Sequence, residues 1–145
     1  MSDAIPVDKQ RLLDAFLELL AIDSPSGEEG PAIDHLRQRL ARLGLEAEID
    51  SAGNLIGRLA GQGDPLLLCA HVDHVPPCIG IRPIVEDDVI RSDGATVLGG
   101  DDTSGVAIIL EVLEMAREKQ SRAGALPPAV DVVFTVHEEG GLYGS

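Results

Sequence analysis

The sequence predicts an α/β fold in which amphipathic helices alternate with strands of a buried sheet. The run 66–70 is continuously apolar and short, which is typical of a strand buried on both faces, and 130–136 reads as a second buried strand. The segments 7–22 and 28–43 instead repeat their apolar residues at helical spacing. We therefore expect one layered domain with helices on both faces of the sheet.

The first part of the chain contains two predicted helices and two short strands. The helix over 7–22 ends at a Ser-Pro-Ser-Gly break, and the helix over 28–43 ends at Gly44, a natural C-terminal stop. Residues 45–50 alternate apolar and acidic side chains, as a half-buried strand does, and 54–59 reads as a second strand after a turn.

Less regular sequence connects these elements to the last helix and strand. A Gly- and Pro-containing turn is predicted at 61–65, and the stretch 75–100 is rich in Pro, Gly and Asp, with short strands expected near 81–85 and 89–91. The segment 102–119 is then a strong helix. Its predicted inward-facing residues are Val106, Ile109, Leu110 and Leu113.

Charge, hydropathy and cysteine content argue against several kinds of partner and location. The net charge of −14 argues against nucleic acid and against anionic membrane surfaces. No apolar run approaches the roughly 18–20 residues that span a bilayer. The first eight residues contain no basic region followed by an apolar stretch, and Cys69 and Cys78 do not make a disulfide framework. We expect a cytoplasmic protein in which Cys69 is an inert core thiol.

Three short clusters of His, Asp and Glu lie at the ends of the apolar segments. They are His71 with Asp73 after the first buried strand, Asp101 with Asp102 before the last helix, and His137 with Glu138 and Glu139 after the last strand. Sites in open α/β sheets collect at the carboxyl ends of strands, so we expect the clusters to meet. So many carboxylates around one point would repel one another unless a dication lay among them.

Each cluster allows a chemical and a plain structural interpretation. On an extended backbone His71 and Asp73 point to the same side, so the imidazole can bind Zn²⁺ while the carboxylate accepts its other ring N–H. Asp101 can direct one oxygen to each of two cations, whereas Asp102 is also what an acidic helix start requires. The structural alternative for His71 is a loop histidine beside a solvated Asp. His74 points the other way and is given no role.

The paired glutamates suggest a division of labour. Adjacent side chains at a strand end diverge, so one can ligate a cation while its neighbour takes a proton from an attacking water as general base. An exposed acidic turn is the structural alternative for Glu138 and Glu139, and His137 is most simply a flanking residue.

In their order along the chain, His71-Val72-Asp73, the segment 92–102 and the segment 134–140 resemble the peptidase T-like branch of the aminoacylase/carboxypeptidase G superfamily of two-zinc exopeptidases. The N-terminal helices and the segment 53–57 also fit. A related group of cocatalytic aminopeptidases has a large insertion between the first two motifs, where this chain has a short interval. The resemblance implies a three-layer αβα zinc-exopeptidase fold of the phosphorylase/hydrolase-like type.

The resemblance also implies roles for single residues. His71 would bind one zinc ion, Asp101 would bridge two, and Glu139 would bind the other. Asp73 would support His71, Glu138 would be the general base, and the peptide bond after Asp101 would be cis. The implied cofactor is two zinc ions per complete site, which Co²⁺ or Mn²⁺ can replace.

Residues 1–145 would be the N-terminal part of the catalytic domain, an incomplete fold without the dimerisation and lid domain or the C-terminal part of that domain. The family's remaining metal ligands lie beyond Ser145, so each ion would keep two protein ligands instead of three. We therefore expect weak or absent metal occupancy and little or no activity in this chain alone. Its uncovered apolar surface should favour self-association.

For the full-length enzyme the resemblance implies metal-dependent hydrolysis of a peptide bond in small peptides, of the tripeptide aminopeptidase type, by a homodimer. An N-acyl-amino-acid deacylase with the same metal site stays open as an alternative. So does a non-catalytic binding or regulatory module that keeps the fold.

Overall fold

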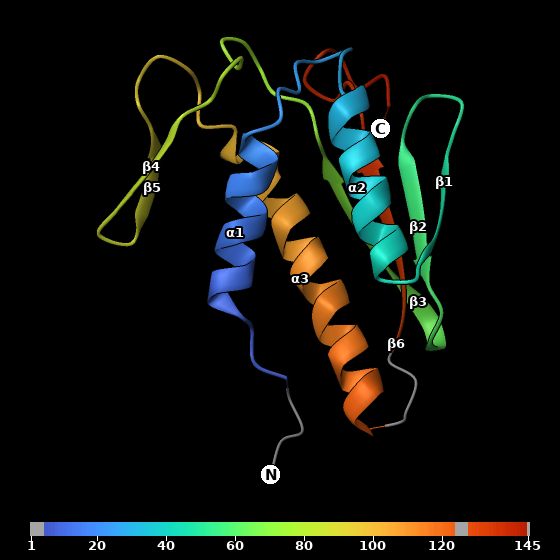
Figure 1. Cartoon of the computed structure of the whole chain (residues 1–145). Coiled ribbons are helices and arrows are strands. Elements are labelled where there is room, and N and C mark those ends of the chain that lie inside the picture. Colours follow the sequence, from blue (N-terminus) through green and yellow to red (C-terminus); the bar gives the residue numbers. More distant parts are fainter. Residues whose placement is uncertain (1–4, 124–127, 145) are drawn as a thin grey trace.

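The computed structural model describes residues 5–123 and 128–144. Residues 1–4 belong to the N-terminal segment that was compared with a signal peptide, and they lie outside the described part of the chain, as does Ser145. Within it, helices pack on a four-stranded sheet, and a two-stranded hairpin projects to one side (Figure 1). The elements in chain order are α1 (Lys9–Leu20), α2 (Gly30–Arg42), β1 (Glu46–Ile49), β2 (Leu55–Leu59), β3 (Gln62–His71), β4 (Pro83–Glu86), β5 (Val89–Ser92), α3 (Gly100–Ala123) and β6 (Pro128–Thr135).

The strand order β1-β2-β6-β3 positions the candidate site. β6 runs parallel to β3, with His71 opposite Thr135, and antiparallel to β2. The carboxyl ends of β3 and β6 therefore meet at the same edge of the sheet, and the residues that follow them leave the sheet together. The predicted α/β class is confirmed.

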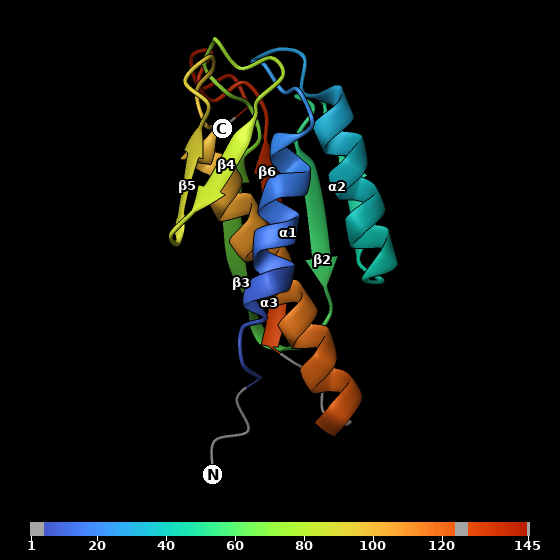
Figure 2. The same cartoon turned by 60° about the vertical axis from the view of Figure 1, so that its left-hand side comes forward.

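The helices cover one face of the sheet, and the core lies between them and that face (Figures 1 and 2). Leu55, Val132 and Phe134 are fully buried there. The opposite face carries Leu67, which is 62% exposed, and Cys69, which is also exposed. The predictions of helices on both faces, of a doubly buried strand over 66–70 and of a buried Cys69 are therefore wrong for the described residues. A continuous apolar run is the same whether one face or both are covered, so the pattern alone does not distinguish them.

The predicted helices and strands are otherwise present, with boundaries shifted by a few residues, although β1 is exposed along its whole length and not half-buried as predicted. Asp8 caps α1 by accepting from the backbone N–H groups of Gln10 and Arg11, and Gly44 has φ of +71° where α2 ends. The predicted turn over 61–65 is wrong, because β3 begins at Gln62 and passes through a register shift before Leu66. None of the helices in the described residues has the length and apolar character needed to cross a bilayer.

Candidate metal centre

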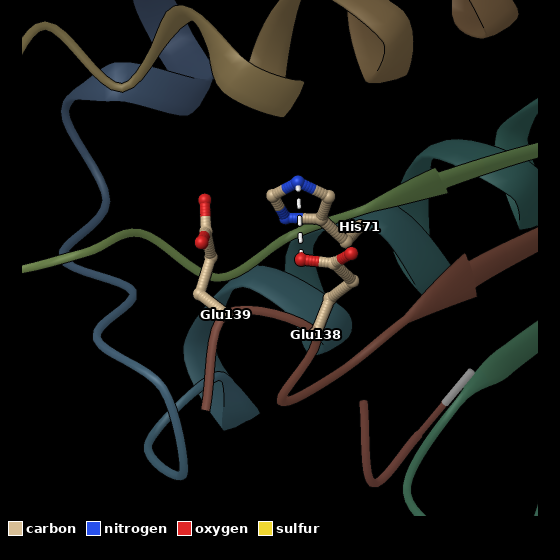
Figure 3. A group of neighbouring side chains, drawn as sticks. All are labelled: His71, Glu138 and Glu139. Atoms are coloured by element: carbon tan, nitrogen blue, oxygen red, sulfur yellow. Dashed lines mark ion pairs between the residues drawn. The ribbon is translucent and has the colours of Figure 1, made fainter. Parts of the chain in front are cut away.

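Three segments of the chain bring the clusters together at the sheet edge where β3 and β6 end. His71 is the last residue of β3, and Glu138 and Glu139 lie in the turn that follows β6. Each of these residues offers one ligand atom, and these atoms lie within 4.8 Å of one another (Figure 3). Asp101, at the start of α3, reaches the same group, since its Oδ1 is 3.2 Å from Nε2 of His71.

The surroundings of His71 favour the tautomer that a metal ligand needs. Nδ1 lies 3.0 Å from the backbone carbonyl oxygen of Asp73, so an N–H at Nδ1 can donate to it. Nε2 then faces Asp101 and also Glu138, whose Oε2 is 4.0 Å away. Burial lowers the pKa of His71, but the hydrogen bond to Asp101 and the charges of Asp73 and Glu138 outweigh it, so the pKa is raised. The site attracts positive charge.

The Asp73 side chain makes its hydrogen bonds to groups other than the His71 ring. Its Oδ1 is 3.6 Å from Nδ1 of His71, beyond hydrogen-bond distance, while the carboxylate accepts from Ser26 Oγ at 2.6 Å and from the N–H groups of Glu138 and Glu139 at 3.0 Å each. The side chain is completely buried. Burial would raise the pKa of Asp73, but these hydrogen bonds outweigh it and the pKa is lowered. Asp73 thus fixes the turn that carries both glutamates.

Two further buried polar side chains hold the same turn, and the sequence interpretation missed both of these roles. Oε1 of Glu29 accepts from the N–H groups of Gly27 at 2.7 Å and His137 at 2.9 Å. Oδ1 of Asn54 accepts from Val136 N at 3.0 Å. The only signal for Asn54 was its place within the segment 53–57 that fits the family. Nothing in the sequence marks Glu29, which looks like an ordinary helix-start acid.

The two aspartates at the start of α3 have separate environments. The Asp101 side chain is 86% exposed, and the Asp101–Asp102 peptide bond is cis, as the resemblance implied. Both residues have non-helical backbone angles, so regular helix begins after them. Oδ1 of Asp102 accepts from Gly105 N at 3.0 Å, which is the bond of an N-terminal cap. Asp102 therefore fits the structural interpretation, and Asp101 remains available to the site.

The donor set suits a divalent cation. One imidazole nitrogen and carboxylate oxygens from Asp101, Glu138 and Glu139 face one region, and mixed N and O donors are the ligands that zinc takes in hydrolytic sites. A dication among these carboxylates would also neutralise their mutual repulsion. The residues therefore fit the metal that the resemblance implies.

Comparison with known proteins identifies the family of the chain. Residues 54–145 match the model of peptidase family M28, and because this match covers more than half of the chain, the chain belongs to that family. A tripeptidase structure from Staphylococcus aureus has 39% identity and a TM-score of 0.87 over 95% of this chain and 39% of its own. The aminopeptidase PepT structure from Bacillus cereus has 32% identity and a TM-score of 0.85 over 93% of this chain and 38% of its own.

The Bacillus subtilis protein YqjE is 35% identical over 96% of this chain and 39% of its own length. The chain thus spans less than two fifths of these relatives. The resemblance to the peptidase T-like branch, and the zinc-exopeptidase type of fold, are confirmed by the tripeptidase and PepT structures.

Proposed function

We propose that the protein carrying this chain is a metal-dependent aminopeptidase that removes the N-terminal residue from small peptides, tripeptides in particular. The observation that carries the proposal is the convergence of the His71 imidazole with the carboxylates of Asp101, Glu138 and Glu139 at one sheet edge. The likeness to a tripeptidase and to an aminopeptidase, at 39% and 32% identity, supports a peptide as substrate.

In this proposal His71 and Glu139 would each hold one of two zinc ions, and Asp101 would serve as a ligand to both. Zinc held by these residues would supply a Lewis acid for the scissile carbonyl and for the attacking water. Glu138 is the general base, which takes the proton of the attacking water and passes it to the leaving amine. Its carboxylate is about one third exposed, while its backbone N–H is held by Asp73, so the group is both accessible and oriented.

Separate substitution of the two glutamates tests these roles. In the protein expressed from its complete reading frame, Glu138→Gln should lower kcat on a tripeptide by about 10²–10⁴-fold and leave the zinc Kd unchanged. Glu139→Gln should weaken zinc binding at least about tenfold. Glu48→Gln, on the exposed strand β1, is the matched control and should change neither quantity. Wild-type turnover in both site variants would contradict the proposal, and the reverse pattern would exchange the two roles.

A substrate panel separates the remaining alternatives. Tripeptides and N-acyl amino acids are offered to the full-length protein after chelation and after return of Zn²⁺, Co²⁺ or Mn²⁺. Preference for tripeptides supports the aminopeptidase. Preference for N-acyl amino acids identifies a deacylase with the same metal site, and no turnover with either class identifies a non-catalytic module.

We further infer that the full-length protein is a cytoplasmic homodimer. Two unpaired cysteines, one exposed and one buried, suit a reducing compartment. The dimer rests on the resemblance. Sedimentation of the full-length protein tests it, and a monomer at micromolar concentration would contradict it.

A further inference from the structure

His74 lies between two segments that carry the candidate metal centre. It directly follows Asp73, yet its side chain is turned into the protein and is 3% exposed. Nε2 lies 2.8 Å from Oγ1 of Thr103, in the first turn of α3. The backbone N–H of His74 donates to the carbonyl oxygen of Ser24 at 2.9 Å. One residue therefore joins the segment after β3, the loop before α2 and the start of α3.

A small cavity lies beside this connection. Its volume is about 10 Å³, and it is lined by the polar residues Ser24, His74 and Thr103 and by five apolar residues. Those apolar residues are Leu19, Ala32, Leu36, Val72 and Val106. A cavity of about 10–15 Å³ holds one water molecule when polar groups line it. This cavity thus has the size and the lining of a hydration site.

Two polar atoms of the residues that line this cavity need a partner. Oγ of Ser24 and Nδ1 of His74 are shielded from solvent, and neither finds a hydrogen-bond partner among residues 5–123 and 128–144. Both residues are more than nine-tenths buried, Ser24 being 1% exposed. Buried polar groups in native proteins are almost always paired, frequently through ordered water. A water in contact with both atoms would satisfy them together.

We propose that one water molecule in this cavity bonds to Ser24 Oγ and His74 Nδ1, and that the chain Ser24–water–His74–Thr103 positions the segment carrying His71 and Asp73 against the start of α3, which carries Asp101. His74 is a positioning residue in this arrangement. The inference rests on the proposed function, because its purpose is to hold two metal-binding segments at a fixed distance.

The surroundings of the ring fit that purpose. Burial lowers the pKa of His74, and a neutral imidazole offers one donor and one acceptor, one for Thr103 and one for the water. The backbone at Gly99, two residues before Asp101, packs directly on the ring. A Cβ atom there would lie 2.9 Å from Nε2. The ring therefore contacts both the hydroxyl and the backbone that lead into α3.

An isosteric pair of substitutions at Thr103 tests the positioning. In the full-length protein, Thr103→Val removes the hydroxyl and keeps the shape, and should weaken Zn²⁺ binding about tenfold. Thr103→Ser keeps the hydroxyl and should stay within about twofold of wild type. Ser24→Ala, at the other end of the chain of bonds, should weaken Zn²⁺ binding in the same direction. The visible absorption of bound Co²⁺ should shift in Thr103→Val and return in Thr103→Ser.

A high-resolution crystal structure of the wild type tests the water itself, without reference to metal. An ordered water within hydrogen-bond distance of Ser24 Oγ and His74 Nδ1 supports the proposal. A direct bond between these two atoms, or a dry cavity, overturns it. Thr103→Val with wild-type Zn²⁺ affinity and an unchanged Co²⁺ spectrum overturns the positioning role. A wild-type protein that binds neither ion contradicts the proposed function instead, while the crystal structure still decides the water.

Discussion

Replacing Asp73 by Asn should destabilise the protein far more than its small change in volume suggests. The carboxylate is fully buried and accepts three hydrogen bonds, from the Ser26 hydroxyl and from the N–H groups of Glu138 and Glu139. An Asn at this position keeps one acceptor oxygen and replaces the other by an NH₂ group, which donates. At least one N–H group in the glutamate turn then faces another donor.

The magnitude follows from the arrangement of these bonds. With the amide oxygen in the place of Oδ2, the bonds from Ser26 and Glu139 survive and the bond from Glu138 is lost. A hydrogen bond to a charged group is worth about 1.5–3 kcal/mol, and the surviving bonds lose the charge that strengthened them. We expect the free energy of unfolding to fall by about 3–4 kcal/mol, built from these per-bond values.

Urea unfolding followed by circular dichroism, in the presence of a chelator, measures this loss without a contribution from metal. Asp131→Asn is the matched control, since Asp131 pairs with the largely exposed Arg58 and such surface pairs contribute about 0–1 kcal/mol. If the Asp73 variant unfolds within about 1 kcal/mol of that control, the carboxylate does not hold the turn as described.

Three further predictions concern the rest of the molecule. The hydrogen bond from Arg11 holds the pKa of buried Glu111 below its usual value. The pair therefore stabilises the folded protein at pH values above the pKa of Glu111 in the unfolded chain, which is about 4.3. This contribution should disappear as the pH falls below that value. Glu111→Gln should flatten this part of an acid unfolding curve, and an unchanged curve would contradict the assignment. Gly57→Ala should lower the free energy of unfolding in urea by about 1–3 kcal/mol, because its Cβ would lie 2.6 Å from the Leu40 side chain of α2. An unchanged free energy of unfolding would show that α2 moves freely to accommodate the added methyl group. Leu67→Lys, on the open sheet face, should reduce concentration-dependent association of the 145-residue chain in sedimentation, whereas equal association in both proteins would place the contact elsewhere.

Local pattern was sufficient for most elements. The helical spacing of apolar residues predicts α1, α2 and α3, because a helix that buries one face must repeat at that period. Prediction from local pattern failed where the same sequence of apolar residues is compatible with both a buried and an exposed sheet face. The run over 66–70 is apolar throughout, yet in β3 its side chains alternate between the helix-covered face and an exposed one. The turn residues at 62–65 are likewise compatible with an irregular strand.

The motif residues that meet at the sheet edge were predicted, since topology places the ends of parallel strands together. The groups that hold them were not. Glu29 is separated from His137 by more than a hundred residues, and an acid near a helix start gives no sign of being buried. His74 was given no role because alternation along a strand says only that it points away from His71.

The amino-acid sequence by itself determined the α/β class, the order of helices and strands and the residues of the candidate metal centre, because periodicity and strand ends are local properties of the chain. Only the tertiary structure decided which sheet face is covered, that Asp73 binds the glutamate turn, and that Ser24, His74 and Thr103 meet at one cavity. Hydrogen bonds and burial depend on distances between segments far apart in the chain, and those distances exist only after the chain has folded.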